Sequence, residues 1–569
     1  MIAVIRTRMN PQILAAVVTI AVLSGTASKA EACDENGPLC PCAWSDDAVP
    51  VYVNSATMSA YLLPARSSAA WERIVQTVLN IFRENSGIAL NLYYAGTTTQ
   101  TRINGAIVVV GSQDCSNYLG LESTNFNLLN PGSISSSRIT LYRKTGDTTA
   151  GTCQDNYWDP RLLPQGGSPA IPNTADPTNI LVHEFGHAIG AKHPDNYCNI
   201  TNASVMQSAV PIWARHFTRY DKTFFQSKYG TQRPLGFSSN HNGTHLCSPL
   251  PWPSSNGQTF FPLPGSASVP AGPGAPELAW GFGSLNLSGL VAMRQFSTGA
   301  WQSDLYDGNE PHYSKAAAAY GGSGKRRVFY FYEPTGTASK NDRKKLVYRE
   351  RSAGAWGAVV DVLVNNNIVQ SRRDGVAAAF DWATGNYIVL YNDDDEDVSQ
   401  NPICDPACNR IQVVTLPGPN SALSSNQRTL LGHHSFSTPT VACHRTSTAP
   451  DRCLIAFSTS QASPWLQWIE GGPSSAGIWQ SSGDRSQTSI ELDLSPTVSF
   501  STADGRFYLG TQKRYGTTTQ YAIHRKTYST GAFFSLITQV SSTSQKFSSV
   551  TMSSNSSGLL RYHLFKYQE

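Results

Sequence analysis

The first half of the chain combines one amphipathic segment with several short apolar runs. Apolar side chains recur at helical spacing between Ser67 and Gly87, which predicts a helix that ends at the glycine. The apolar runs at 49–54, 88–94 and 105–111 are short enough to predict buried strands, and the more polar run at 137–144 predicts an edge strand. Together they predict an α/β unit over residues 43–232.

The second half of the chain repeats a pattern of strand-length apolar runs. A short motif, written STGAW, SAGAW, SAGIW or STGAF, begins at Ser297, Ser352, Ser475 and Ser529, and strand-like runs precede its copies. Repeats of about four strands predict the blades of a β-propeller. The last residues of the chain supply two strands without the motif, and 290–303 supplies closing strands without opening ones.

Pairing these two ends would leave no exposed sheet edge, which predicts a five-bladed β-propeller over residues 276–569. A pair of β-sandwiches is the alternative. Residues 233–275 are rich in Pro, Ser, Gly and Asn without periodicity, as in linkers. A chain of 569 residues also exceeds what one hydrophobic core usually supports. The predicted fold class is therefore multidomain, an α/β (α+β) domain followed by an all-β domain.

The N-terminal thirty residues have the order of a secretory signal peptide. Arg6 and Arg8 precede an apolar run at 13–23, and small residues lead to Ala30. The run is shorter than the roughly 20 residues that a membrane-spanning helix needs. We expect cleavage after Ala30 or Ala32, with a retained anchor as the alternative. The mature protein is then secreted, by an export signal of bacterial type, with no membrane span.

Composition limits the classes of partner that the protein is expected to bind. Only 14% of the residues are charged, and the formal net charge is +4. No basic stripe occurs, so nucleic acid is not an expected partner. The acidic run at 392–397 lacks the spaced ligands and the glycine turn of a calcium loop, so a structural Ca²⁺ ion stays open and is assigned to no residue.

All eleven cysteines follow the predicted signal peptide, which fits an oxidising compartment. Four pairings are plausible, although connectivity does not follow from sequence: Cys115 with Cys153, Cys198 with Cys247, Cys404 with Cys408, and Cys443 with Cys453. The odd total leaves one thiol over, which we expect among Cys33, Cys40 and Cys42 in the segment 31–42. A latency switch through one of these three thiolates is a hypothesis beside ordinary disulfides.

One motif carries metal-binding chemistry. His183 and His187 are four residues apart on a predicted helix that starts at Pro177, so both imidazoles project from one face. Glu184 lies beside them, and Gly190 allows the chain to turn so that His193 becomes a third ligand. Three histidines with an open fourth position are typical of a catalytic zinc site, because structural sites use four protein ligands.

The pattern HExxHxxGxxH resembles the signature of the metzincin superfamily of zinc proteases. Met206, thirteen residues after His193, lies where that family has its Met-turn. The resemblance covers roughly residues 43–230 and implies a matrixin-like catalytic domain. Ser208 stands where some members place a tyrosine, which argues against a tyrosine ligand here.

By this resemblance the protein is expected to be a zinc endopeptidase acting on protein or peptide substrates. One Zn²⁺ ion on His183, His187 and His193 would activate water, with Glu184 as general base and acid. Residues 208–217 would wall the specificity pocket. The C-terminal domain would bind a surface polymer or a protein.

Two other functions are open. One alternative is a binding protein or adhesin with a catalytically weak zinc-protease-like domain. The other is a glycosidase built on the propeller, which would need a carboxylate pair in a central pocket.

Overall fold

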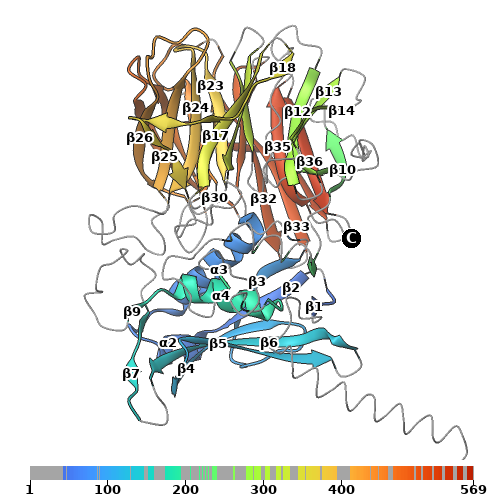
Figure 1. Cartoon of the computed structure of the whole chain (residues 1–569), viewed down its shortest axis with the longest axis vertical. Helices are drawn as coiled ribbons and strands as arrows, with labels where there is room; N and C mark the ends of the chain where they lie inside the picture. Colours follow the sequence, from blue (N-terminus) through green and yellow to red (C-terminus); the bar gives the residue numbers. More distant parts are fainter. Residues whose placement is uncertain are drawn as a thin grey trace, which may run out of the picture.

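The computed structural model describes residues 43–567 with gaps, of which the longest are 159–173, 194–204, 207–216, 240–259, 263–276, 333–343 and 394–409. The predicted signal peptide and the segment 31–42, with Cys33, Cys40 and Cys42, lie outside the described residues. So do the pairs Cys198–Cys247 and Cys404–Cys408, the acidic run at 394–397, and Ser208. The N-terminal unit occupies one end of the molecule, and a group of antiparallel sheets occupies the other (Figure 1).

The N-terminal unit is built on a mixed sheet with the order β1-β6-β4-β2-β3. Neighbours along this path are parallel, whereas β5 and β7 pair antiparallel with β6. A separate parallel pair joins β8 and β9. The strands are β1 (Ala43–Trp44), β2 (Ala48–Asn54), β3 (Asn91–Thr98), β4 (Ile107–Ser116), β5 (Gly120–Asn127), β6 (Asn130–Thr145), β7 (Gln154–Asp155), β8 (Tyr157–Trp158) and β9 (Thr174–Ala175).

Three helices belong to the described part of this unit: α2 (Ser55–Tyr61), α3 (Ser68–Asn85) and α4 (Pro177–Ala188). The predicted amphipathic helix is confirmed as α3, and its apolar face is buried against the sheet and α4. This face contains Trp71, Ile74, Val75, Val78, Leu79 and Phe82. Burial of six large apolar side chains is worth on the order of 10 kcal/mol before the entropy of ordering the chain is subtracted.

The predicted edge strand is wrong. Residues 137–144 lie within β6, which pairs with β4 on one side and with β5 on the other. Ser136, Ser137 and Thr140 of this strand are buried although they are polar, and they pair with β5, which the sequence did not reveal as a strand. Strand β5 also contacts helix α4.

The C-terminal unit consists of six antiparallel sheets. The first sheet contains β11 (Phe260–Pro262), β12 (Glu277–Leu285), β13 (Ser288–Phe296) and β14 (Trp301–Asp307). The second contains β15 (Ala317–Tyr320), β16 (Arg326–Tyr332), β17 (Lys344–Ser352), β18 (Ala355–Trp356), β19 (Val360–Asp361) and β22 (Gln370–Ser371). The third contains β23 (Val376–Asp381), β24 (Asn386–Asp393), β25 (Arg410–Pro417) and β26 (Gln427–His434). A small hairpin, β20 (Leu363–Val364) with β21 (Asn367–Ile368), extends from the second.

The remaining three sheets complete the unit. The fourth sheet contains β27 (Thr440–Cys443), β28 (Cys453–Ser458), β29 (Trp465–Pro473) and β30 (Trp479–Glu491). The fifth contains β31 (Thr497–Ser501), β32 (Arg506–Tyr515), β33 (Thr518–Thr527) and β34 (Ser535–Ser542). The sixth contains β35 (Phe547–Ser554), β36 (Leu560–Tyr567) and β10 (Pro234–Ser239). The first strands of consecutive sheets, from β15 through β23, β27 and β31 to β35, contact one another. This arrangement is propeller-like, as the repeat predicted.

The predicted number of five blades is wrong, because the described residues of the C-terminal unit already form six sheets of three or more strands. The tail strands β35 and β36 pair with each other, and β36 pairs with β10 rather than with residues 290–303, which belong to a sheet of their own with β11 and β12. Both β10 and β11 lie in the segment predicted as a linker, where short runs such as FFP gave no periodic signal. The predicted fold class is corrected accordingly: the described chain is predominantly β-strand, and its helices are confined to the N-terminal unit.

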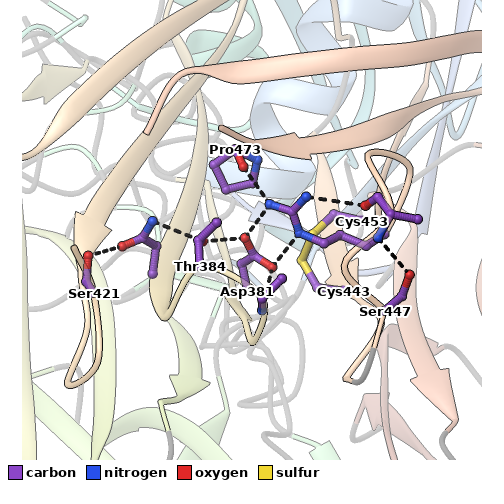
Figure 2. Close-up of polar contacts among 11 residues, drawn as sticks. Asp381, Thr384, Ser421, Cys443, Ser447, Cys453 and Pro473 are labelled. Atoms are coloured by element: carbon purple, nitrogen blue, oxygen red, sulfur yellow. Dashed lines mark hydrogen bonds and ion pairs between the residues drawn. A yellow bond between two sulfur atoms is a disulfide. The ribbon is translucent and has the colours of Figure 1, made fainter. Parts of the chain in front are cut away.

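Buried polar contacts link neighbouring sheets of the C-terminal unit. Arg452, at the start of β28, donates to both carboxylate oxygens of Asp381 in the preceding sheet at 2.7 Å, as Figure 2 shows. Lys526 and Glu470 form a second buried pair at 2.5 Å between the next two sheets. Each pair satisfies charges that would otherwise be costly to bury, so the order of the sheets is fixed by polar contacts as well as by packing.

Two predicted disulfides are confirmed. Cys115–Cys153 joins the end of β4 to the chain that precedes β7, and Cys443–Cys453 crosses the β27–β28 hairpin. Among the described residues, no helix is long and apolar enough to cross a membrane.

Candidate functional site

Helix α4 carries the first two histidines of the motif, and its ends are defined as the sequence predicted. Asp176 is the N-cap, whose side chain accepts a hydrogen bond from the Thr178 N–H at 3.0 Å, and Pro177 follows at the first helical position. Gly190 has a φ of +84°, a conformation that favours glycine, and it ends the helix. The chain then turns back toward His193.

The structure brings the three predicted metal ligands together. The Nε2 atoms of His183 and His187 are 2.9 Å apart, those of His187 and His193 are 3.1 Å apart, and those of His183 and His193 are 3.2 Å apart. These three residues form a group that could hold a metal ion within the described residues. In a tetrahedral zinc site with Zn–N distances of about 2.0–2.1 Å, ligand nitrogens lie roughly 3.3 Å apart. The cluster therefore fits one zinc ion.

Hydrogen bonds fix the tautomers of two of these imidazoles. His183 Nδ1 lies 2.8 Å from the Val205 carbonyl oxygen, and His187 Nδ1 lies 2.9 Å from the Ala191 carbonyl oxygen. Because a carbonyl only accepts, each Nδ1 carries the proton and donates it. Each Nε2 is then an unprotonated atom with a lone pair, as a metal ligand must be.

Burial keeps the same imidazoles neutral. Desolvation, followed by the neighbouring His187, lowers the pKa of His183 well below its ordinary value. Desolvation, followed by the neighbouring His193, lowers the pKa of His187 to about 4. Both imidazoles are therefore neutral at physiological pH without competition from protons, which favours metal binding.

Met206 lies directly beneath the motif helix. A Cβ atom placed on Gly186 would lie 2.2 Å from the Met206 sulfur, so glycine at this position is what lets the methionine approach α4 between the two histidines. The preceding residue, Val205, orients His183 through its carbonyl, and its own N–H donates to the buried carboxylate of Asp221 at 3.1 Å. The segment at Met206 therefore supports the ligand geometry, although it binds no metal itself.

Glu184 is buried beside the three histidines, and β5 covers it. Only 6% of Glu184 is exposed, and a Cβ atom on Gly120 would lie 2.8 Å from its carboxylate oxygen. Desolvation and the nearby Glu122 carboxylate raise the pKa of Glu184 to about 8, whereas a hydrogen bond from the Glu122 backbone N–H opposes that shift. This surrounding strand was missed in the sequence, because GLESTNFN lacks an apolar alternation.

Glu122 is a half-buried carboxylate of β5. It accepts hydrogen bonds from Ser137, at 2.5 Å, and from Thr124, and desolvation raises its pKa while these bonds and the Arg102 charge lower it. Arg102 also donates to the Ser123 carbonyl at 2.9 Å. Two acidic side chains thus lie near the three histidines, and a bound divalent cation would favour the ionised form of Glu184.

Among the described residues, the group that could hold a metal ion consists of these three histidines. Of the predicted pocket wall, residues 208–216 lie outside the described residues. Phe217 is fully buried and packs on Phe82 with ring centroids 4.6 Å apart, so it belongs to the core rather than to a pocket.

No family model matches the chain, and no curated protein is recognisably similar to it in sequence. Among solved structures, a mutant of AofleA from Arthrobotrys oligospora is 13% identical, covering 55% of this chain and 85% of its own, with a TM-score of 0.33. A mutant of Aleuria aurantia lectin in complex with α-methyl-L-fucoside is 13% identical, covering 46% and 73%, with a TM-score of 0.31. A GH43_12 protein retrieved from the capybara gut metagenome is 9% identical, covering 58% and 57%, with a TM-score of 0.26.

The expected family assignment is corrected. No family model and no curated relative supports membership of the metzincin superfamily, and the solved structures named above, with TM-scores of 0.33 or lower, assign no family either. The metzincin catalytic domain, the zinc endopeptidase activity and the protein or peptide substrates are therefore withdrawn. The alternative function, a binding protein, is retained.

Proposed function

We propose that this chain is an exported binding protein, whose N-terminal unit holds one zinc ion and whose C-terminal unit recognises an extracellular polymer. The observation that carries the proposal is the convergence of three imidazole Nε2 atoms within 3.2 Å of one another, two of them fixed as lone-pair donors by their Nδ1 hydrogen bonds.

A cation explains this convergence better than packing does. The Nε2 atoms of His183 and His187 cannot donate to each other while their protons lie on Nδ1, so at 2.9 Å their lone pairs repel. A zinc ion between them turns this repulsion into coordination. Glu184, buried beside the cluster, offsets part of the charge that a dication brings with three neutral ligands.

The zinc ion in this proposal stabilises the N-terminal unit. Its ligands come from α4 and from the turn after Gly190, and Val205 holds His183 from a third segment. A metal that binds only the folded state adds its binding free energy to the stability of that state. Recognition is assigned to the C-terminal unit, and the predicted signal peptide supports an extracellular location.

Metal analysis tests this proposal. Purified wild-type protein, dialysed against zinc, is expected to hold one zinc ion per chain, and His193→Ala is expected to lose it. His433→Ala is the matched control, because His433 lies in the C-terminal unit and bonds to Asp484 there. Zinc retained equally by His193→Ala would contradict the proposed ligand set.

Peptide hydrolysis supplies the opposing test. Wild-type protein loaded with zinc is expected to leave a quenched-peptide library intact. Chelator-sensitive cleavage that disappears in Glu184→Ala at equal zinc content would overturn the assignment as a binding protein, because it would show that the zinc site supports catalysis.

A further inference from the structure

Three turns of the C-terminal unit converge at the ends of its first strands. Tyr320 ends β15, Trp382 follows β23, and Arg445 follows β27 by two residues. The Tyr320 and Trp382 rings have centroids 6.0 Å apart, and the Arg445 guanidinium lies 5.6 Å from the Trp382 centroid. Two aromatic rings and a guanidinium from three different sheets thus form one cluster, which we call the Trp382 cluster. All three side chains are half-buried and therefore keep exposed surface.

Buried polar contacts hold the Trp382 cluster in place. Asp381, which directly precedes Trp382, is fully buried and accepts two hydrogen bonds from Arg452 at 2.7 Å, as Figure 2 shows. The Asp381 side chain also accepts a hydrogen bond from Thr384 and one from the Ala383 N–H. Arg452 reaches across to the Pro473 carbonyl as well. The turn that presents Trp382 is therefore tied to the loop that presents Arg445.

The loop 444–452 is closed at its base. The Cys443–Cys453 disulfide and the hydrogen bond from the His444 N–H to the Arg452 carbonyl, at 2.7 Å, join its two ends. Inside the loop, the Ser447 N–H donates to His444 Nδ1 at 3.0 Å, and the His444 ring packs on Phe500 of the following sheet. A loop constrained in this way loses little further entropy when a ligand binds, as preorganised sites require.

Arg445 is the member of the Trp382 cluster whose positive charge favours an anionic ligand. Burial lowers the pKa of its guanidinium, while the nearby Tyr320 opposes that shift. In the part of the chain that the structure describes, no carboxylate pairs with Arg445; its contact is with the face of Trp382. A partly desolvated guanidinium without an anion is unfavourable, so an anionic group bound there gains a charge-assisted hydrogen bond.

We propose that the Trp382 cluster binds a saccharide that carries a carboxylate, with the sugar ring against Trp382 and Tyr320 and the carboxylate on Arg445. This inference rests on the proposed binding function, for which it names the ligand class and the place. The apolar face of a pyranose ring packs on an aromatic side chain, and a guanidinium matches a carboxylate with two parallel hydrogen bonds. A neutral saccharide would leave Arg445 without its anion.

A glycan array tests this inference with the full-length protein. It should contain uronate-bearing and sialate-bearing glycans beside matched glycans whose carboxyl groups are reduced to alcohols. Wild-type protein is expected to bind acidic members at least 10-fold more tightly than their reduced counterparts. Arg445→Gln should lose about 10- to 100-fold in affinity for the acidic members and little for the reduced ones. Trp382→Ala should weaken both.

Matched variants separate a lost site from a lost fold. Phe533→Ala removes an aromatic ring that is 61% exposed in another sheet, and it should leave binding unchanged. Arg445→Lys keeps the charge and should recover part of the affinity that Arg445→Gln loses, with an unchanged melting temperature. Binding of neutral glycans alone, or acidic binding that survives Arg445→Gln, would overturn this inference and leave the proposed function standing. Absence of all glycan binding would overturn this inference and the assignment of glycan recognition to the C-terminal unit, whereas the zinc content measured above tests the N-terminal part of the proposed function separately.

Discussion

The metal cluster and the Trp382 cluster are assembled from very different lengths of chain. His183, His187 and His193 span eleven residues, and one helix with one turn brings them together. Tyr320, Trp382 and Arg445 come from three consecutive sheets, and a buried ion pair and a disulfide position them. The first kind of site is visible in a sequence as a spaced motif. The second kind of site exists only once the sheets have packed, so no sequence motif predicts it.

The same difference implies that the two units respond to different perturbations. The N-terminal unit has one large apolar core around α3 and α4, whereas the C-terminal unit has several smaller cores between neighbouring sheets. Metal removal should therefore act on the first unit, and loss of contacts between sheets should act on the second.

The largest effect is expected from breaking the link between Asp381 and Arg452. Arg452→Met leaves the Asp381 carboxylate buried without its cation, which should cost about 3–5 kcal/mol of unfolding free energy. Denaturant unfolding of the C-terminal unit measures this loss of unfolding free energy. Arg143→Met is the matched control, because its pair with Asp155 is about one-third exposed and should cost less than about 1 kcal/mol. Equal effects of the two variants would refute the special role of the buried pair.

Metal removal should give the next largest effect, and only in the N-terminal unit. At a free zinc concentration of 1,000 times Kd, a single site adds about 4 kcal/mol, which a chelator would remove. Scanning calorimetry should show one transition moving to lower temperature while the other stays in place. A chelator that shifts both transitions equally, or neither, would argue against a zinc site confined to the histidine cluster.

A smaller effect is expected from His524, a buried histidine of the C-terminal unit. Its Nε2 lies 3.1 Å from the Thr511 hydroxyl, and burial lowers its pKa from 6.5 to about 4. Between these pH values the unfolded chain binds a proton that the folded chain does not. Stability should therefore fall as the pH drops from about 6.5 to 4, by on the order of 2–3 kcal/mol. His524→Gln should flatten this slope, and a slope that persists would show that other groups cause it.

The smallest effect is expected at Gly120, where β5 crosses the motif helix. A Cβ atom there would lie 2.7 Å from Ile180 and 2.8 Å from the Glu184 carboxylate, so Gly120→Ala should cost about 1–3 kcal/mol. Gly483→Ala is the control, because its Cβ would meet no atom within 4 Å. If both variants unfold at the same denaturant concentration, β5 does not press on α4 as the structure indicates.

Much of the local structure could be predicted from the sequence. The helix at 67–87 and the strands of the repeat follow from periodicity, which acts over short ranges, and the disulfides Cys115–Cys153 and Cys443–Cys453 were among the pairings that the sequence made plausible. The ends of α4 follow from Asp176, Pro177 and Gly190 for the same reason.

The remaining features depend on tertiary contacts. Strand β5 has no apolar alternation, since one side of it covers α4, and β10 pairs with β36 more than 300 residues later in the chain. The sixth sheet was missed for that reason. The metzincin resemblance rested mainly on five fixed positions within eleven residues and on a methionine, and a short motif predicts a site better than it predicts a family.

The central claim is that His183, His187 and His193 hold one zinc ion, and an anomalous-scattering crystal structure of the zinc-loaded protein tests it most directly. The account predicts one strong anomalous peak about 2.0–2.1 Å from each of the three Nε2 atoms, absent from crystals of His187→Ala. A zinc-loaded crystal with no peak among the three imidazoles, or with its peak at other residues, would contradict it.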